Sequence, residues 1–141
     1  MKRFIFLIVA IVITLGCSED PNDQQQKLIV KTDKNNYSIN EIIIFSINNS
    51  SSTTAHLASC CTSVAFYIDR NENNNWVEHS NFGLPCLALC PGIDLALNYF
   101  EILTDSISLD ESGTFRIRIP YTFNPDQNWT SEILSNSFTI E

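Results

Sequence analysis

The chain has 141 residues, of which 16 are acidic and 8 are basic, so its formal net charge at pH 7 is −8. This acidity excludes nucleic acid as an expected partner, because a polyphosphate is repelled by a surface of the same sign. Hydrophobic residues make up 44% of the chain, which is typical of a folded globular protein rather than a disordered one.

Residues 1–16 have the pattern of an export signal. A cationic head of Lys2 and Arg3 precedes an apolar run over residues 4–15. About a dozen apolar residues are too few to cross a bilayer of ~30 Å as a helix, but they suit the central region of a signal peptide. Residues 14–17, Thr-Leu-Gly-Cys, resemble the cleavage site of bacterial lipoproteins, in which a small residue precedes the acylated Cys. The resemblance implies membrane attachment through a lipid on Cys17 and a mature net charge of 6 − 16 = −10.

Residues 17–26 are predicted to be the lipidated Cys and a flexible tether, because they are acidic and polar with little to bury. Residues 18–20, Ser-Glu-Asp, also resemble the signal that sends lipoproteins of the Bacteroidota to the cell surface, although a merely polar tether explains them equally well. Residues 27–141 are predicted to form one domain. The expected location is the bacterial envelope, at the outer membrane, facing either the periplasm or the outside.

The domain sequence shows period-two alternation of apolar residues and no sustained helical period. The strands predicted in this way cover residues 28–31, 43–48, 64–69, 76–77, 115–121 and 137–141. Counting the less regular stretches, about seven short strands follow one another at spacings near a dozen residues. This pattern predicts an all-β fold, a single antiparallel β-sandwich of immunoglobulin-like type.

An Asn-rich stretch interrupts these strands at residues 71–75. Oxygen-bearing side chains at Asp69, Asn71, Asn73 and Asn75 have the spacing of the first half of a calcium loop. The second half lacks the glycine and the bidentate Glu of such a loop, so a hairpin turn is the preferred interpretation. No metal is predicted.

Four cysteines remain after lipidation, and an exported chain meets oxidising conditions. We expect Cys60, Cys61, Cys86 and Cys90 to form disulfides, in which each of the first two pairs with one of the last two. A four-thiolate zinc site is the alternative, but spacings of zero and three residues suit it poorly. The stretch 80–94 between these groups contains two prolines and two glycines and is expected to be irregular.

Catalytic residues are not recognisable in this sequence. The two histidines, His56 and His79, stand in polar surroundings without a motif that supplies a nucleophile. We therefore expect a protein that is not an enzyme and needs no cofactor.

Three apolar residues are candidates for binding. Phe82 and Leu87 belong to the 80–94 stretch, whose apolar residues either complete the core or form a partner patch. Trp129 lies in a polar connection, where it either caps the end of the sandwich or serves as a platform for a ligand.

The order of landmarks from residue 28 to residue 140 is similar to that of uncharacterised bacterial lipoproteins with an immunoglobulin-like domain. These landmarks include a Cys ahead of a strand, a Trp after a polar turn, a later Cys, and Gly-Thr-Phe-Arg-Ile-Arg at 113–118. The resemblance implies a sandwich and no activity. The expected function is a lipid-anchored envelope module that binds a protein or a glycan; the alternative is an inhibitor of extracellular proteases that presents residues 80–94.

Overall fold

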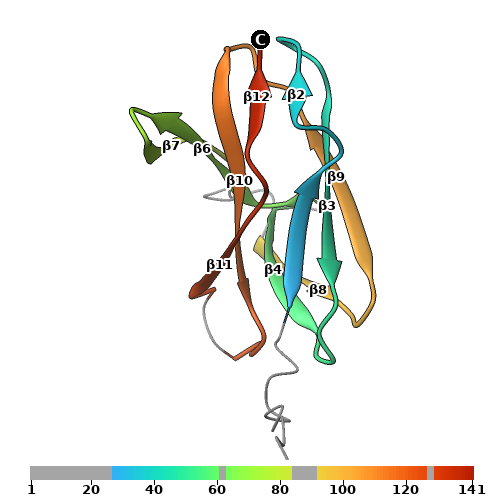
Figure 1. The fold of residues 1–141 in the computed structure, drawn as a ribbon. Helices are drawn as coiled ribbons and strands as arrows, with labels where there is room; N and C mark the ends of the chain where they lie inside the picture. The colour runs from blue at the N-terminus through green and yellow to red at the C-terminus, as the bar shows by residue number, and fades with distance from the viewer. Residues whose placement is uncertain (1–26, 61–62, 84–91, 127–128) are drawn as a thin grey trace, which may run out of the picture.

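The computed structural model describes residues 27–60, 63–83, 92–126 and 129–141, and all regular structure in these ranges is β (Figure 1). The strands are β1 (Leu28–Thr32), β2 (Asn36–Tyr37), β3 (Ile43–Asn49), β4 (Ala55–Cys60), β5 (Ser63–Val64), β6 (Phe66–Glu72), β7 (Asn75–Phe82), β8 (Gly92–Leu97), β9 (Ile102–Ile107), β10 (Gly113–Thr122), β11 (Ser131–Leu134) and β12 (Phe138–Ile140). An all-β fold is therefore confirmed, whereas about seven strands was too few for the described residues.

These strands form two sheets. The smaller sheet has the order β1-β3-β9, and the larger is built along β2-β12-β10-β4-β5, with β6 and β11 also paired to β10, β7 to β6, and β8 to β4. Every pairing is antiparallel except that of β2 with β12. The N-terminal segment thus changes sheets between β1 and β2, which ties the two sheets together at the start of the domain.

Both sheets contribute to one hydrophobic core, so the arrangement is a β-sandwich. The predicted alternation decides which side chains enter it: Ile43, Phe45 and Ile47 of β3 are completely buried. Phe45 meets Phe66 of the opposite sheet edge to face, with ring centroids 5.1 Å apart. Each such side chain contributes about 1.5–3 kcal/mol of burial free energy, so the facing surfaces of the sheets stabilise one another.

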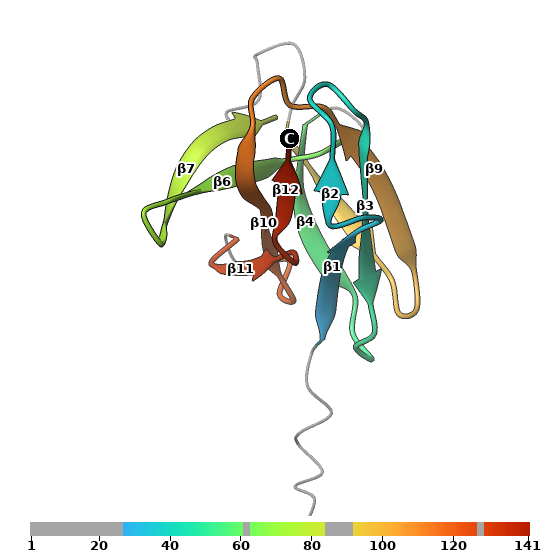
Figure 2. The same ribbon diagram turned by 45° about the horizontal axis from the view of Figure 1, so that its top comes forward.

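The chain enters the sandwich at what we call the tether end, the end that contains residue 27 and the first residue of β1. Leu28 pairs with Asn49 at the far end of β3, and the N–H of Asn49 donates to the C=O of Glu101 ahead of β9 (3.1 Å). Figures 1 and 2 both place the start of β1, the β3–β4 turn and the β8–β9 turn together at this end. The β2–β3 turn and the C-terminus lie at the opposite end.

The Asn-rich stretch forms the tight turn of the β6–β7 hairpin. Asn73 and Asn74 have φ values of 53° and 68°, the left-handed conformation that asparagine tolerates better than most residues. The N–H of Asn74 donates to Oδ1 of Asn71 at 3.1 Å, which fixes the start of the turn. The hairpin turn predicted from the sequence is therefore confirmed.

The prediction that residues 80–94 are irregular throughout was wrong at both ends. Residues 80–82 continue β7, where Phe82 pairs with Phe66, and residues 92–94 begin β8, where Gly92 pairs with Cys60. Existing strands supply these residues with pairing partners, so the local turn formers do not interrupt the ladders. Residues 84–91 lie outside the described part of the chain.

Candidate functional site

A hollow of about 380 Å³ lies between the two sheets, beside the ends of β4, β7 and β9. Its lining comes from three regions that are far apart in sequence: the strands β4 to β6, the end of β7 and the end of β9. The lining residues are Cys60, Ser63, Val64, Phe66, Phe82, Gly83, Asp105, Ser106, Ile107 and Ser108. A hollow of this size, apolar inside with a few polar groups, is typical of a binding site.

The floor of the hollow is apolar. Phe82, half-buried, stacks on the buried Phe66 with ring centroids 5.0 Å apart and ring planes 20° from parallel. Val64 and Ile107 are both buried and complete this floor from opposite sheets. An apolar side chain placed here would leave water and contact hydrocarbon on several sides, which is favourable.

The rim is polar and belongs largely to β9, an edge strand of the smaller sheet. Asp105 is half-buried, and its Oδ1 accepts the backbone N–H of Ser106 at 2.8 Å. Opposite Ser106 in the ladder is Ile44, whose N–H and C=O both bond to Asp33 on the β1 side (3.2 and 2.9 Å). In an antiparallel ladder, when one residue of a directly opposed pair turns its N–H and C=O away from its partner, the partner does the same. The backbone of Ser106 therefore points away from β3, toward the open edge.

A second polar group lies on the outer face of the larger sheet, around the buried Asp69. Its carboxylate accepts hydrogen bonds from Nε of Arg116 at 3.0 Å and from Nε of Arg118 at 3.1 Å. Trp76 covers the Arg116 guanidinium (4.4 Å from the ring centroid) and Tyr67 covers that of Arg118 (4.3 Å). The calcium interpretation would have required the Asp69 carboxylate as a metal ligand. Both of its oxygens instead accept hydrogen bonds from guanidinium groups.

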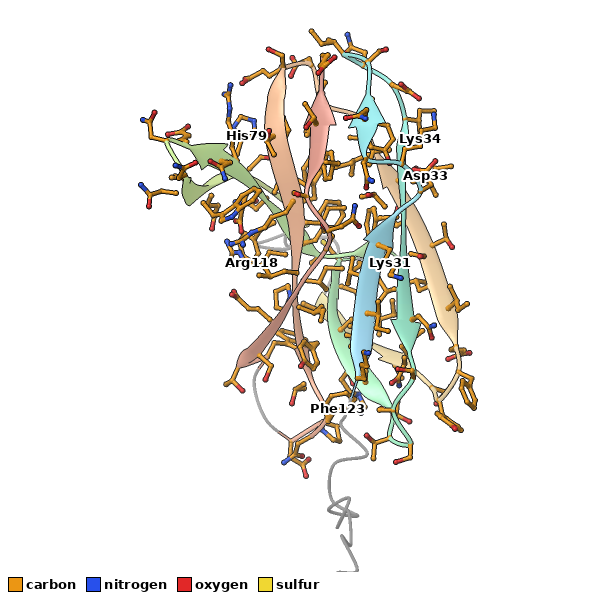
Figure 3. All side chains as sticks on the ribbon, in the orientation of Figure 1. Lys31, Asp33, Lys34, His79, Arg118 and Phe123 are labelled. Atoms are coloured by element: carbon orange, nitrogen blue, oxygen red, sulfur yellow. The ribbon has the colours of Figure 1, made fainter. Side chains whose placement is uncertain are left out.

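Arg118 connects this group to two further strands. Its terminal nitrogens bind Glu78 on β7 (3.0 Å) and Glu132 on β11 (2.6 Å). Partial burial acts to lower the pKa of Arg118, but the hydrogen bonds that its guanidinium donates to Glu132 and Asp69 outweigh burial and raise the pKa above its ordinary value. Figure 3 shows Arg118 beside the β10 strand, on the side of β6 and β11. The network connects β6, β7, β10 and β11. Its role is therefore to hold these strands together.

The two histidines lie on different strands. His56 on β4 pairs through Nδ1 with the carboxylate of Asp94 on β8. His79 on β7 is labelled in Figure 3, and the centroid of its ring lies 5.5 Å from the ring centroid of Phe115 on β10. His56 thus joins two paired strands, whereas His79 contacts a ring on β10 across β6, which lies between β7 and β10.

The structure separates the residues that the sequence singled out for binding. Phe82 lines the hollow, whereas Trp129 lies in the connection from β10 to β11 with 40% of its surface exposed. Cys60 ends β4 beside the hollow. Cys17, Cys61, Cys86, Cys90 and Leu87 lie outside the described residues.

The β9 side of the hollow was missed by the sequence analysis. Leu103, Asp105 and Ile107 share one face of β9, and an acid at the middle position hides the apolar alternation. Within the described ranges, no three His, Cys, Asp or Glu side chains are grouped to hold a metal, and no helix has the length and apolarity to cross a membrane.

No protein-family model matches the chain, and no curated protein matches it. Among solved structures, it is similar to the alkylpurine DNA glycosylase AlkC of Pseudomonas fluorescens, with 7% identity over 83% of this chain and a TM-score of 0.46; it spans 31% of that chain. It is also similar to a CARDB domain from Pyrococcus furiosus, with 13% identity over 82% of this chain and 88% of that one, and a TM-score of 0.41. Likenesses of this strength bear on neither ligand nor reaction.

Proposed function

We propose that this protein is a lipid-anchored module of the bacterial envelope, with an immunoglobulin-like sandwich, that binds a partner polypeptide and catalyses no reaction. The partner adds a strand to the open edge of β9. One apolar side chain of the partner enters the hollow lined by Phe66 and Phe82.

The observation that carries this proposal is the position of the hollow along an edge strand. The outward C=O of Ser106 offers a backbone hydrogen bond to an added strand, and its N–H, which donates to the Asp105 carboxylate, can exchange that local acceptor for a carbonyl of the strand. The hollow begins at the same residues of β9. Strand addition obtains affinity from main-chain bonds and specificity from pockets for alternate side chains. Both elements of that recognition mode are present here within four consecutive residues, 105–108.

The lipid anchor is supported by the sequence of residues 1–17. Cys17→Ser is expected to abolish labelling of the protein by palmitate and to leave an uncleaved precursor that does not partition into detergent with lipoproteins. Wild-type protein that incorporates no palmitate would contradict the anchor while leaving the β9 site untouched.

The β9 site is tested by Ser106→Pro against Ser106→Ala in the full-length acylated protein. Proline removes the outward N–H, and with it the bond to Oδ1 of Asp105, but no bond to β3. Alanine keeps the N–H and removes only the hydroxyl. Envelope proteins captured by the wild type should be retained by Ser106→Ala and reduced at least tenfold by Ser106→Pro. Equal melting temperatures for the two variants are the control for folding.

Three results would contradict the proposed strand addition or favour another function. Equal capture by both variants would contradict strand addition at β9. Capture of a secreted protease whose activity falls with added protein would favour the inhibitor function instead. Capture that survives proteolysis of the extract but not removal of its glycans would indicate glycan binding.

We also propose that Cys60 forms one of two disulfides, pairing with Cys86 or Cys90. Its support is the register: Cys60 pairs with Gly92, two residues after Cys90. A Cβ placed on Gly83, three residues before Cys86, would lie 3.1 Å from the Cβ of Cys60. Two or three residues span at most about 7–11 Å, so the chain is short enough for either candidate partner to reach Cys60.

A further inference from the structure

Three aromatic side chains are strongly exposed in the described part of the chain, and all three lie in connections at the tether end. Tyr99 and Phe100, in the β8–β9 turn, expose 51% and 67% of their surfaces, and Trp129 exposes 40%. Trp129 precedes β11, whose first residue Ser131 pairs with Tyr121 near the end of β10. Figure 3 shows Phe123, in the same β10–β11 connection, at this end of the molecule.

The β8–β9 turn is fixed in the conformation that exposes its rings. The N–H of Phe100 donates to the C=O of Asn49 at 2.8 Å, and the N–H of Asn98 donates to the Glu101 carboxylate at 2.6 Å. Phe100 has a φ of 59°, a left-handed conformation that is costly for a bulky residue. The rings of Tyr99 and Phe100 lie against each other, with centroids 3.8 Å apart. The fold thus holds two apolar rings in solvent at a cost in backbone strain.

The tether end is also where the chain leads back toward Cys17. The N–H of Ser50, next to the β3–β4 turn, donates to the C=O of Lys27 at 2.9 Å. Lys27 lies ten positions after Cys17, so this end of the domain can lie at most about 35 Å from an acylated cysteine.

We propose that Tyr99, Phe100 and Trp129 insert into the interfacial layer of the membrane that holds the lipid anchor. This inference rests on the proposed lipidation of Cys17. The rings of Tyr99 and Trp129 carry a polar group and prefer the headgroup region of a bilayer, where one part of the ring meets hydrocarbon and another meets water. Phe100 adds an apolar ring, whose transfer out of water is favourable. The short connection to the anchor keeps these rings close to the membrane, so even weak individual contacts are populated.

The charge of the protein selects the lipid surface. A mature net charge of −10 opposes contact with anionic headgroups, so insertion is expected to be strongest in zwitterionic phosphatidylcholine or phosphatidylethanolamine. At the opposite end, the exposed apolar side chains are aliphatic, Ile39 and Ile42, and they provide a matched comparison.

Contact at the tether end determines where β9 points. The strand begins at the tether end, where Ile102 pairs with Asn48, and ends at Ile107, which pairs with Ile43 near the opposite end. Residues 105–108 therefore lie on the half of the domain that is directed away from the membrane.

The experiment uses the two native tryptophans as reporters in the full-length acylated protein, reconstituted into phosphatidylcholine vesicles with brominated acyl chains. Trp76→Phe leaves Trp129 as the only indole, and Trp129→Phe leaves Trp76. Bromine is expected to quench at least half of the Trp129 fluorescence and less than a tenth of the Trp76 fluorescence. Adding Phe100→Ser to the Trp76→Phe protein should reduce the quenching at least twofold, and adding Ile42→Ser should leave it unchanged.

The mass of the N-terminal peptide is measured on the same sample. Acylated protein with equal and weak quenching at both tryptophans would overturn the membrane contact alone. Protein without an acyl chain would overturn the proposed anchor, and this inference with it. Quenching of Trp129 that Phe100→Ser leaves unchanged would overturn the insertion of the Tyr99–Phe100 turn.

Discussion

Asp69 is the buried charge on which the outer face of the larger sheet depends. Its side chain is almost fully covered, and the two arginines that bind it are themselves mostly buried. Removing one partner from such a group leaves the other charges desolvated without compensation, which costs more than the pair contributes net. Trp76 and Tyr67 cover the guanidiniums, so water cannot readily replace the lost carboxylate.

We therefore predict that Asp69→Asn lowers the free energy of unfolding by about 2–4 kcal/mol, measured by urea denaturation at pH 7. Glu111→Gln is the matched control, because Glu111 pairs with Arg70 (3.0 Å) in a largely exposed position. It should change stability by no more than about 0.5 kcal/mol. Equal effects of the two substitutions would contradict a special role for Asp69.

Tyr37 gives the stability of the β1–β2 connection a dependence on pH. Its hydroxyl donates to Oδ1 of Asp33 at 2.6 Å, and this hydrogen bond is the main reason why the pKa of Asp33 is below its usual value. Figure 3 labels Asp33 and Lys34 at this connection. Because the folded-state pKa is depressed, the stabilisation is present above the unfolded pKa near 4 and is lost as the pH falls through the folded value.

Tyr37→Phe is accordingly predicted to lower stability by about 1 kcal/mol at pH 7, where the phenol bonds a charged carboxylate. The difference from the wild type should shrink as the pH is lowered below about 4, because Asp33 becomes protonated in both proteins. Thermal denaturation at pH 7, 5 and 3 measures it; a difference that is constant over this range would show that Asp33 is not the acceptor that matters.

Among the elements, the β6–β7 hairpin depends most directly on its turn sequence. Asn74 occupies a left-handed position that glycine adopts without strain and a β-branched residue adopts poorly. We predict that Asn74→Gly raises the free energy of unfolding by about 0.5 kcal/mol and that Asn74→Val lowers it by about 1 kcal/mol. Asn75→Val is the control, since Asn75 begins β7 and should tolerate the change; a similar loss at both positions would contradict the turn argument.

Strands with one buried and one polar face could be predicted from the sequence, and others could not. In β3, every second residue is buried, and the matching alternation of apolar residues in the sequence predicted the strand. In β4, residues 57–59 are buried in succession, and β11 is exposed at three of its four residues, so neither strand has the contrast that reveals a period. The hollow was beyond prediction for a related reason: its walls come from β5, β7 and β9, and only tertiary packing brings these strands together.

Pro120 shows how an interior strand position accommodates a residue without an N–H. Within sheets, proline is usually confined to edge strands, strand ends or bulges, yet Pro120 lies within β10. The pairing of β10 with β6 ends at Arg118, and its pairing with β4 begins at Tyr121. Pro120 thus falls between two ladders on that side of the strand.

For the whole molecule, the proposed disulfides give the clearest test. A bond that closes a loop of about thirty residues is worth roughly 3–4 kcal/mol in the chain-entropy account, so reduction should lower the melting temperature by roughly 10 °C or more. The denatured, unreduced protein should show no reactive thiol among Cys60, Cys61, Cys86 and Cys90. Four reactive thiols together with one equivalent of zinc would establish the metal site instead.

The place of β10 in the chain bears on when the protein folds. This strand pairs with β4, β6, β11 and β12, so the larger sheet cannot form around its central strand until residues 113–122 have been synthesised. Pairings between residues so distant in sequence form slowly, because a long loop must close before any contact compensates for the lost entropy. A ribosome-bound chain that lacks its last thirty residues therefore stays open and sensitive to protease. In the export that we propose, a chain crosses the membrane as an extended polypeptide, and this late closure would keep it competent for transport until residues 113–122 have been synthesised.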